Sequence, residues 1–148
     1  MKVLVAYDGT MQSKEALKYG LERVRERGGE VIALHVFNSN MFIGYDSQPW
    51  ALDHAKKESA QYMQEARKIV DETAPGVRVR FATEEGDPEE EIINYALERN
   101  ADLLLCPPRY RGIIKRYKKI LDENGRKVTE DSILDGADKL KMAVISNI

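Results

Sequence analysis

The fold of this chain is decided by residues 3–10, which read VLVAYDGT. Five consecutive apolar residues open the stretch, and such a run is typical of a strand that is buried on both faces. An Asp-Gly turn ends the strand, and residues 13–27 then carry apolar side chains at helical spacing up to Gly28 and Gly29. A buried strand that leads directly into an amphipathic helix predicts the beginning of an α/β sheet.

Four further strands are predicted along the chain. Residues 31–37 and 103–106 are almost wholly apolar, whereas residues 77–82 alternate between apolar and other side chains, which predicts an edge strand. Residues 142–145 supply the last strand. Because a strand-helix-strand order produces right-handed crossovers, we expect one doubly wound, five-stranded parallel sheet of order 3-2-1-4-5 with helices on both faces.

Helices are predicted between these strands from apolar residues that recur at helical spacing. Asp87 begins one of them, and Glu90 completes a capping box with it. Residues 38–50 have no clear period and predict a loop. Beyond the first helix, the predicted helices cover residues 55–70, 88–99, 112–121 and 130–140.

Composition limits what the chain can be. Its 148 residues allow one domain, residues 1–148, and 23 basic against 25 acidic residues give no overall signature of a nucleic-acid binder. Cys106 is the single cysteine beside two histidines, so neither an internal disulfide nor a Cys/His zinc site is expected. No apolar run approaches the ~20 residues of a membrane-spanning helix. We therefore expect a cytoplasmic protein without a membrane partner.

The exits of strands one and four mark the predicted ligand site, because doubly wound sheets bind ligands where the strand order reverses. Asp8 stands at one exit, where it either holds a ribose hydroxyl or a metal ion, or simply ends the strand. Cys106 stands at the other exit, either facing the site or filling space as a small buried residue. Thr10 either contacts an anion or, as we favour, caps the following helix. We interpret His35 as a satisfied core histidine, and no catalytic residue is predicted.

Residues 109–119, RYRGIIKRYKK, hold six basic residues and two tyrosines. Three interpretations compete. The segment is either the solvated face of an amphipathic helix, which we favour, or a phosphate site made by Arg109, Arg111 and Lys115, or a surface for nucleic-acid phosphates. We rank nucleic acid last.

Several stretches together resemble the universal stress protein family in order and spacing. They are residues 3–10, 13–17, 34–36 and 101–105. The resemblance covers about residues 1–106 and the last strand, and it implies a small cytoplasmic α/β protein that responds to stress. It also implies a homodimer formed through the last strand. In the ATP-binding members, the positions of Ala6, Asp8 and Val36 line the nucleotide.

The chain departs from the family at the phosphate-binding glycines. ATP-binding members follow the fourth strand with Gly-x-x-Gly, nine residues, and then Gly-Ser or Gly-Thr, whose backbone N–H groups cradle the phosphates. Those positions fall on Pro107, Tyr110 and residues 120–121 in this chain. Proline has no N–H to donate, and tyrosine fits poorly at a positive φ. We therefore expect no phosphate cradle.

These observations predict a stress-response binding or regulatory protein with a degenerate nucleotide site, and we favour this over an enzyme. ATP or AMP remains the candidate cofactor, with weak or no binding of ATP, and another phosphorylated ligand is a further candidate. One alternative is a nucleotide-dependent hydrolase or transferase at the same site, with Asp8 holding a metal ion. The other alternative is nucleic-acid binding through residues 109–119.

Overall fold

A computed structural model gives the structure of this chain. Residues 39–48, which form most of the predicted loop, lie outside the described residues, as does most of the segment predicted as the helix over residues 130–140. The structure describes residues 1–38, 49–125, 127–132 and 141–146, with the backbone alone at residues 49–51, 108, 111, 127–132 and 141–146.

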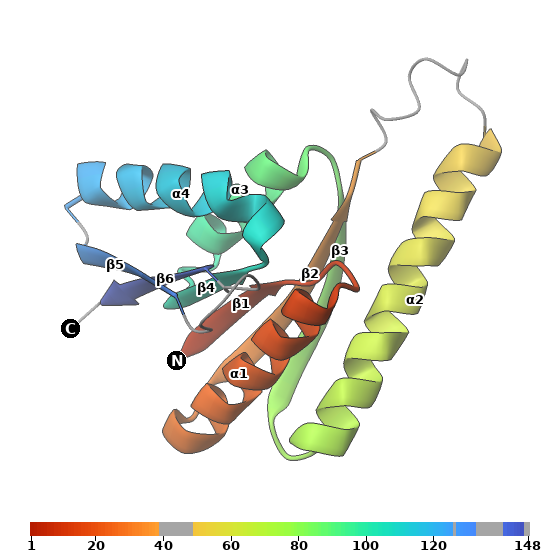
Figure 1. The fold of residues 1–148 in the computed structure, drawn as a ribbon, viewed down its shortest axis with the longest axis horizontal. Coiled ribbons are helices and arrows are strands. Elements are labelled where there is room, and N and C mark those ends of the chain that lie inside the picture. The colour runs from red at the N-terminus through yellow and green to blue at the C-terminus, as the bar shows by residue number, and fades with distance from the viewer. Residues whose placement is uncertain (39–48, 126, 133–140, 147–148) are drawn as a thin grey trace.

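Four parallel strands form the larger part of the sheet, beginning at one of its edges (Figure 1). Their order is β3-β2-β1-β4, so the predicted placement of the first four strands is confirmed, with β3 at one edge. In register, Val3 of β1 lies opposite Val31 of β2 on one side and Leu103 of β4 on the other. The strands are β1 (Lys2–Ala6), β2 (Glu30–Phe37), β3 (Arg78–Glu85) and β4 (Leu103–Cys106).

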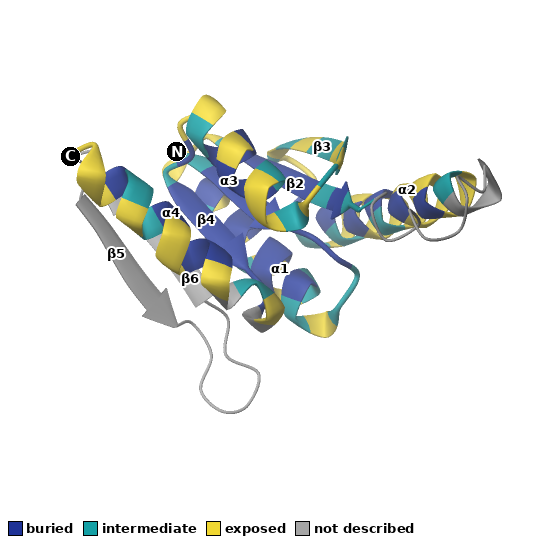
Figure 2. Cartoon of the chain, turned by 90° about the horizontal axis from the view of Figure 1, so that it is seen from above, coloured by how far each residue is buried: buried dark blue, intermediate teal, exposed yellow. Residues whose placement is uncertain are grey.

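Helices cover both faces of this sheet, which explains why its central strands are apolar without a break. Along β1, Val3 and Val5 pack in the cluster beneath α1 and α2, whereas Leu4 and Ala6 pack in the cluster beneath α3 and α4. Figure 2 shows buried residues on the sheet and exposed residues on the outer sides of the helices. The helices are α1 (Met11–Arg27), α2 (Pro49–Thr73), α3 (Pro88–Glu98) and α4 (Arg111–Glu123).

The two predicted helix starts have different outcomes. Thr10 is the N-cap of α1, and its hydroxyl accepts a hydrogen bond from the Ser13 N–H at 3.2 Å. Asp87 also occupies the N-cap position of α3, but its exposed carboxylate makes no capping hydrogen bond. The predicted capping box is therefore not formed at Asp87. Three glutamates in the first turn of α3 still favour the helix, because negative charge stabilises the N-terminal end of its dipole.

The prediction of a fifth parallel strand is wrong. The last strand, β6 (Lys141–Ser146), lies beside β4 but runs antiparallel to it. On its other side it pairs antiparallel with β5 (Lys127–Ser132), so the complete order is β3-β2-β1-β4-β6-β5. Residues 130–132, the predicted start of a helix over residues 130–140, belong instead to the strand β5. Only residues 133–140 join β5 to β6, whereas a connection between two parallel strands needs about a dozen residues or more. The two strands therefore pair antiparallel.

Two further features bear on the site. A single 3-10 turn, η2 (Pro108–Tyr110), follows β4 and leads straight into α4. The helix α2 begins at Pro49, earlier than the apolar pattern predicted, and it lies along α1 on the same face of the sheet (Figure 1). Within the described part of the chain, none of the helices combines the length and the apolar character needed to span a bilayer.

Candidate functional site

A cavity of about 260 Å³ lies at the carboxyl ends of β1 and β2, next to the chain that leaves β4. This is the end of the sheet at which the sequence placed the ligand site. We refer to it as the switch-point cavity. Its walls include Asp8 after β1, His35 and Val36 of β2, Tyr62 of α2, and Arg109 of η2.

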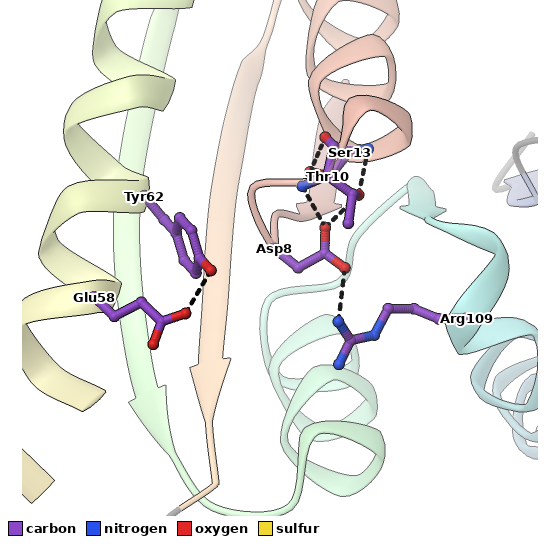
Figure 3. A network of polar contacts seen from close by, with 6 residues as sticks. All are labelled: Asp8, Thr10, Ser13, Glu58, Tyr62 and Arg109. Carbon is purple, nitrogen blue, oxygen red and sulfur yellow. Dashed lines mark hydrogen bonds and ion pairs between the residues drawn. The ribbon is translucent and has the colours of Figure 1, made fainter. Parts of the chain in front are cut away.

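Asp8 is a buried polar group of the switch-point cavity that contacts two other residues. Its side chain is only 4% exposed. The Oδ1 atom accepts hydrogen bonds from the Thr10 N–H at 3.1 Å and from the Thr10 hydroxyl at 2.5 Å (Figure 3). Since Thr10 is itself fixed as the cap of α1, the start of this helix sets the direction of the Asp8 carboxylate.

Arg109 reaches the other oxygen of Asp8. Its Nη1 atom lies 3.3 Å from Asp8 Oδ2, and the guanidinium carbon lies 4.8 Å from the centre of the Tyr110 ring. The Oδ2 atom is buried and has no hydrogen-bond partner among the described residues, so its contact with Arg109 is an ion pair without the alignment of a hydrogen bond. Figure 3 shows Arg109 pointing at Asp8 from the segment after β4, while its own side chain stays 59% exposed.

The helix α2 and the strand β2 form the opposite wall. His35 Nδ1 lies 2.7 Å from the Ser59 hydroxyl oxygen, and the His35 ring meets the Tyr62 ring edge-on with centres 4.9 Å apart. Burial lowers the pKa of His35 below its usual 6.5, so the ring is neutral at pH 7. The Tyr62 hydroxyl donates to Glu58 Oε1 at 2.5 Å, and this hydrogen bond raises the pKa of Tyr62 to about 12.

The structure gathers only some of the residues predicted for the site. Asp8, Val36 and Arg109 line the switch-point cavity. Thr10 supports Asp8, as described above. Ala6 lies in the apolar cluster beneath α3 and α4 and is almost fully buried.

The switch-point cavity is not lined by Cys106 or Lys115, and the side chain of Arg111 lies outside the described residues. Cys106 is fully buried in the same cluster as Ala6, and burial raises the pKa of its thiol, which stays protonated. Lys115 is exposed on α4 and lines a separate surface depression with Lys118 and Lys119. Arg111 begins α4, and its side chain lies outside the described residues. The described side chains of the predicted phosphate site, Arg109 and Lys115, therefore line different cavities.

The positions that correspond to phosphate-binding glycines lie in or next to helical turns. Pro107 immediately precedes η2, and Tyr110 is the half-buried residue before the first turn of α4. Residues 120–121 lie inside α4, where Leu121 is fully buried. The chain thus turns into a helix where a glycine loop would otherwise run.

The basic residues of α4 lie on its outer face. Ile113, Ile114 and Tyr117 point into the core and are at most 2% exposed. Lys115 and Arg116, which lie between these apolar residues, are exposed. The Nη1 atom of Arg116 lies 3.9 Å from Oε1 of Glu89 in α3. This alternation is that of an amphipathic helix with a solvated charged face.

Sequence reasoning did not identify the residues that α2 contributes. Glu58 and Tyr62 are one helical turn apart and both line the switch-point cavity. The available signal was Ser59, a polar residue within the buried stripe of this helix that faces His35. A buried hydroxyl in a helix stripe indicates a polar partner across the interface.

The comparisons with known proteins agree on one family. A universal stress protein of Methanocaldococcus jannaschii is 29% identical over 107 residues, which span 70% of this chain and 62% of that protein. A universal stress protein family structure from Burkholderia pseudomallei aligns with a TM-score of 0.66 at 21% identity, covering 80% of this chain and 88% of that chain. The Archaeoglobus fulgidus universal stress protein in complex with dAMP aligns with a TM-score of 0.62 at 19% identity, covering 81% and 90%.

The two solved structures share the fold with this chain, and the family assignment rests on the sequence. The model of the universal stress protein family matches residues 1–119, which is well over half of the 148 residues. This chain belongs to the universal stress protein family.

Proposed function

We propose that this chain is a stress-response binding protein of the cytoplasm, with a degenerate nucleotide site that binds ATP weakly or not at all. One observation carries the proposal: the chain is helical from Pro108 to Glu123, one residue after the end of β4. A phosphate cradle needs unpaired backbone N–H groups that converge on the anion. In an α-helix, the backbone N–H groups beyond the first turn already donate hydrogen bonds to carbonyl groups of the same helix. They are therefore not free to bind a phosphate.

The surroundings of the switch-point cavity support the same proposal. Pro107 and Pro108 offer no N–H groups at the place where the loop would begin. Arg109 extends over the carboxyl end of β1 to reach Asp8. The volume of about 260 Å³ falls below the roughly 300–1,000 Å³ of most ligand pockets, which leaves little room for a nucleoside triphosphate.

The adenosine side of the site is the part that this chain retains. Asp8 and Val36 line the switch-point cavity at positions where ATP-binding relatives contact their nucleotide. A structural neighbour holds dAMP, which supports a site of nucleotide type in this fold. We therefore expect AMP to bind at least as well as ATP.

Titration calorimetry with ATP and AMP tests this proposal. We expect ATP to bind with a Kd weaker than about 100 µM, which corresponds to less than about 5.5 kcal/mol of binding free energy. The matched variants are Val36→Asp, which places a charge in the cavity, and Arg116→Ala on the outer face of α4. AMP binding should be lost in the first and retained in the second. Submicromolar ATP binding in the unaltered protein would overturn the degenerate site.

A homodimer through the last strands is the second part of the proposal. Because β6 already pairs with β4 and with β5, a second copy that adds to this side of the sheet meets β5. Sedimentation equilibrium of the full chain tests it, with a dimer mass expected. A monomer mass at all concentrations up to about 100 µM would remove this part.

A further inference from the structure

The switch-point cavity holds a carboxylate whose hydrogen-bonding capacity is half used. Asp8 Oδ1 accepts two hydrogen bonds from Thr10, whereas Oδ2 is buried and accepts none from the part of the chain that the structure describes. A buried carboxylate oxygen without an aligned donor is unfavourable, because it has lost water and gained only the unaligned ion pair with Arg109. The Asp8 side chain, 96% buried, therefore presents an unfilled acceptor to the cavity.

The remaining walls favour a positively charged occupant. Glu58 adds a second carboxylate, and Arg109 is the one cation among the described lining residues, because His35 is neutral. When Arg109 swings outward, two negative charges and no positive charge face the space. The rings of Tyr62 and Tyr110 also line it, and aromatic faces attract cations.

Arg109 already places a positively charged group beside Asp8, as a bound cation would. Its guanidinium lies against Asp8 Oδ2 and beside the Tyr110 ring, although most of the side chain is exposed. An exposed arginine that lacks an aligned hydrogen bond is held weakly, so a molecule with better geometry can displace it.

We propose that the switch-point cavity binds a small organic cation, an amine or guanidine with at least two N–H donors, in the place that the Arg109 guanidinium occupies. This inference rests on the proposed function in one respect, that ATP does not use the site. It differs from it in the ligand class, since a phosphate group placed beside Asp8 and Glu58 would be repelled by both carboxylates, so AMP and the cation would compete for different contacts in one cavity. Donors on the cation complete the hydrogen bonding of Oδ2, and its charge replaces that of Arg109.

Calorimetry with butylguanidinium tests the inference, and butylurea serves as the probe of nearly the same shape without charge. Both titrations are run at pH 7 and a fixed salt concentration of about 0.1 M, because salt screens exposed charges. We expect butylguanidinium to bind and butylurea to bind at least about tenfold more weakly. Equal binding of the two probes, or no binding of butylguanidinium even by the Arg109→Ala variant, would overturn the inference.

Variants identify the groups responsible. Arg109→Ala removes the internal competitor and should tighten butylguanidinium binding by about tenfold, whereas Asp8→Asn should weaken it by about tenfold or more. Arg116→Ala is the matched control, an exposed arginine whose contact with Glu89 lies on α3 and α4. It should leave the Kd unchanged. Unchanged binding in Arg109→Ala or in Asp8→Asn contradicts the inference.

Two additions keep the test decisive. If circular dichroism shows that Asp8→Asn does not fold, Glu58→Gln replaces it, with about threefold weaker binding expected and unchanged binding counting against the inference. ATP is titrated in parallel. Submicromolar ATP binding refutes the proposed function, whereas a cavity that rejects both butylguanidinium and ATP refutes the cation alone.

Discussion

Gly9, in the turn after β1, lies directly against Tyr62 of the helix α2. It has a φ of +78°, and a Cβ atom added there would lie 2.5 Å from Tyr62 Cε1. Only glycine satisfies both conditions, because other residues rarely adopt this φ and no Cβ tolerates such a contact. The position of the Tyr62 ring in the switch-point cavity thus depends on the absence of a side chain at residue 9.

The variant Gly9→Ala should destabilise the protein more than Gly125→Ala does. Gly125 has a similar φ of +75°, but a Cβ added there meets nothing within 4 Å. Backbone strain alone should reduce the free energy of unfolding by about 1–2 kcal/mol in Gly125→Ala. Crowding against Tyr62 should add about 1–3 kcal/mol in Gly9→Ala. Urea denaturation measures both, and equal losses would mean that the ring simply moves aside.

His35 gives the protein a defined dependence on pH. Its pKa in the folded state is below 6.5, chiefly because burial disfavours the charged ring. The unfolded chain therefore binds a proton first as the pH falls, and this lowers the free energy of unfolding between pH 6.5 and the pKa of the folded state. Above pH 6.5 the contribution of His35 is constant.

The variant His35→Gln should remove this part of the pH dependence. Its urea midpoint should fall less between pH 7 and pH 5 than that of the unaltered protein. His54→Gln is the matched control, because His54 is exposed on α2 and should leave the slope as it is. A steeper fall in His35→Gln than in the unaltered protein would contradict the lowered pKa.

At the scale of the element, α4 carries two roles on neighbouring residues. Ile114 is fully buried against the sheet, whereas Lys115 is exposed. Truncating Ile114→Ala should reduce the free energy of unfolding by about 2–5 kcal/mol. Lys115→Ala should change it by no more than about 0.5 kcal/mol. Thermal and urea unfolding compare the two, and similar losses would mean that the basic face of α4 packs against another part of the protein.

The strands differ in how far sequence alone could predict them. Residues 31–37 form a strand as predicted. Both faces of β2 are largely buried, and a strand buried on both faces has a continuous apolar run that can be recognised in the sequence. β5 was not predicted, because KVTEDS contains one strongly apolar residue and three charged ones. Its strand conformation comes from pairing with β6, which is an interaction along the sheet and leaves no local pattern.

The residues of the switch-point cavity also differ in how far the sequence alone could predict them. Asp8 and Arg109 were identified because each follows a predicted strand, and the carboxyl ends of parallel strands meet. Glu58 and Tyr62 lie 21 and 25 residues after the end of β2, within the helix α2, and most polar residues of α2 face solvent. The packing of α2 on the sheet selects these two, and a single sequence does not show which part of the exposed face lies over the end of β2.

At the scale of the whole molecule, the near-neutral charge separates into two unlike ends of the sheet. A depression at the amino end of the strands is lined by four basic residues, Lys2, Arg78, Arg80 and Arg99, with two acidic ones. The switch-point cavity at the carboxyl end has two acidic residues and one basic residue. The net charge of −2 is therefore spread unevenly over the described part of the sheet, with basic residues in excess at the amino end and acidic residues in excess at the carboxyl end.

The position of β6 between β4 and β5 has a consequence for biosynthesis. Cys106 of β4 pairs with Lys141, which the ribosome adds 35 residues later. At about 5–20 residues per second, roughly 2–7 s pass between the two. The same interval separates the emergence of β4 and of β6 from the ribosome, and until β6 emerges the apolar β4 has an open edge that another nascent chain can join. The chain therefore passes through a period of aggregation risk during translation, and an early-binding chaperone would protect it at β4.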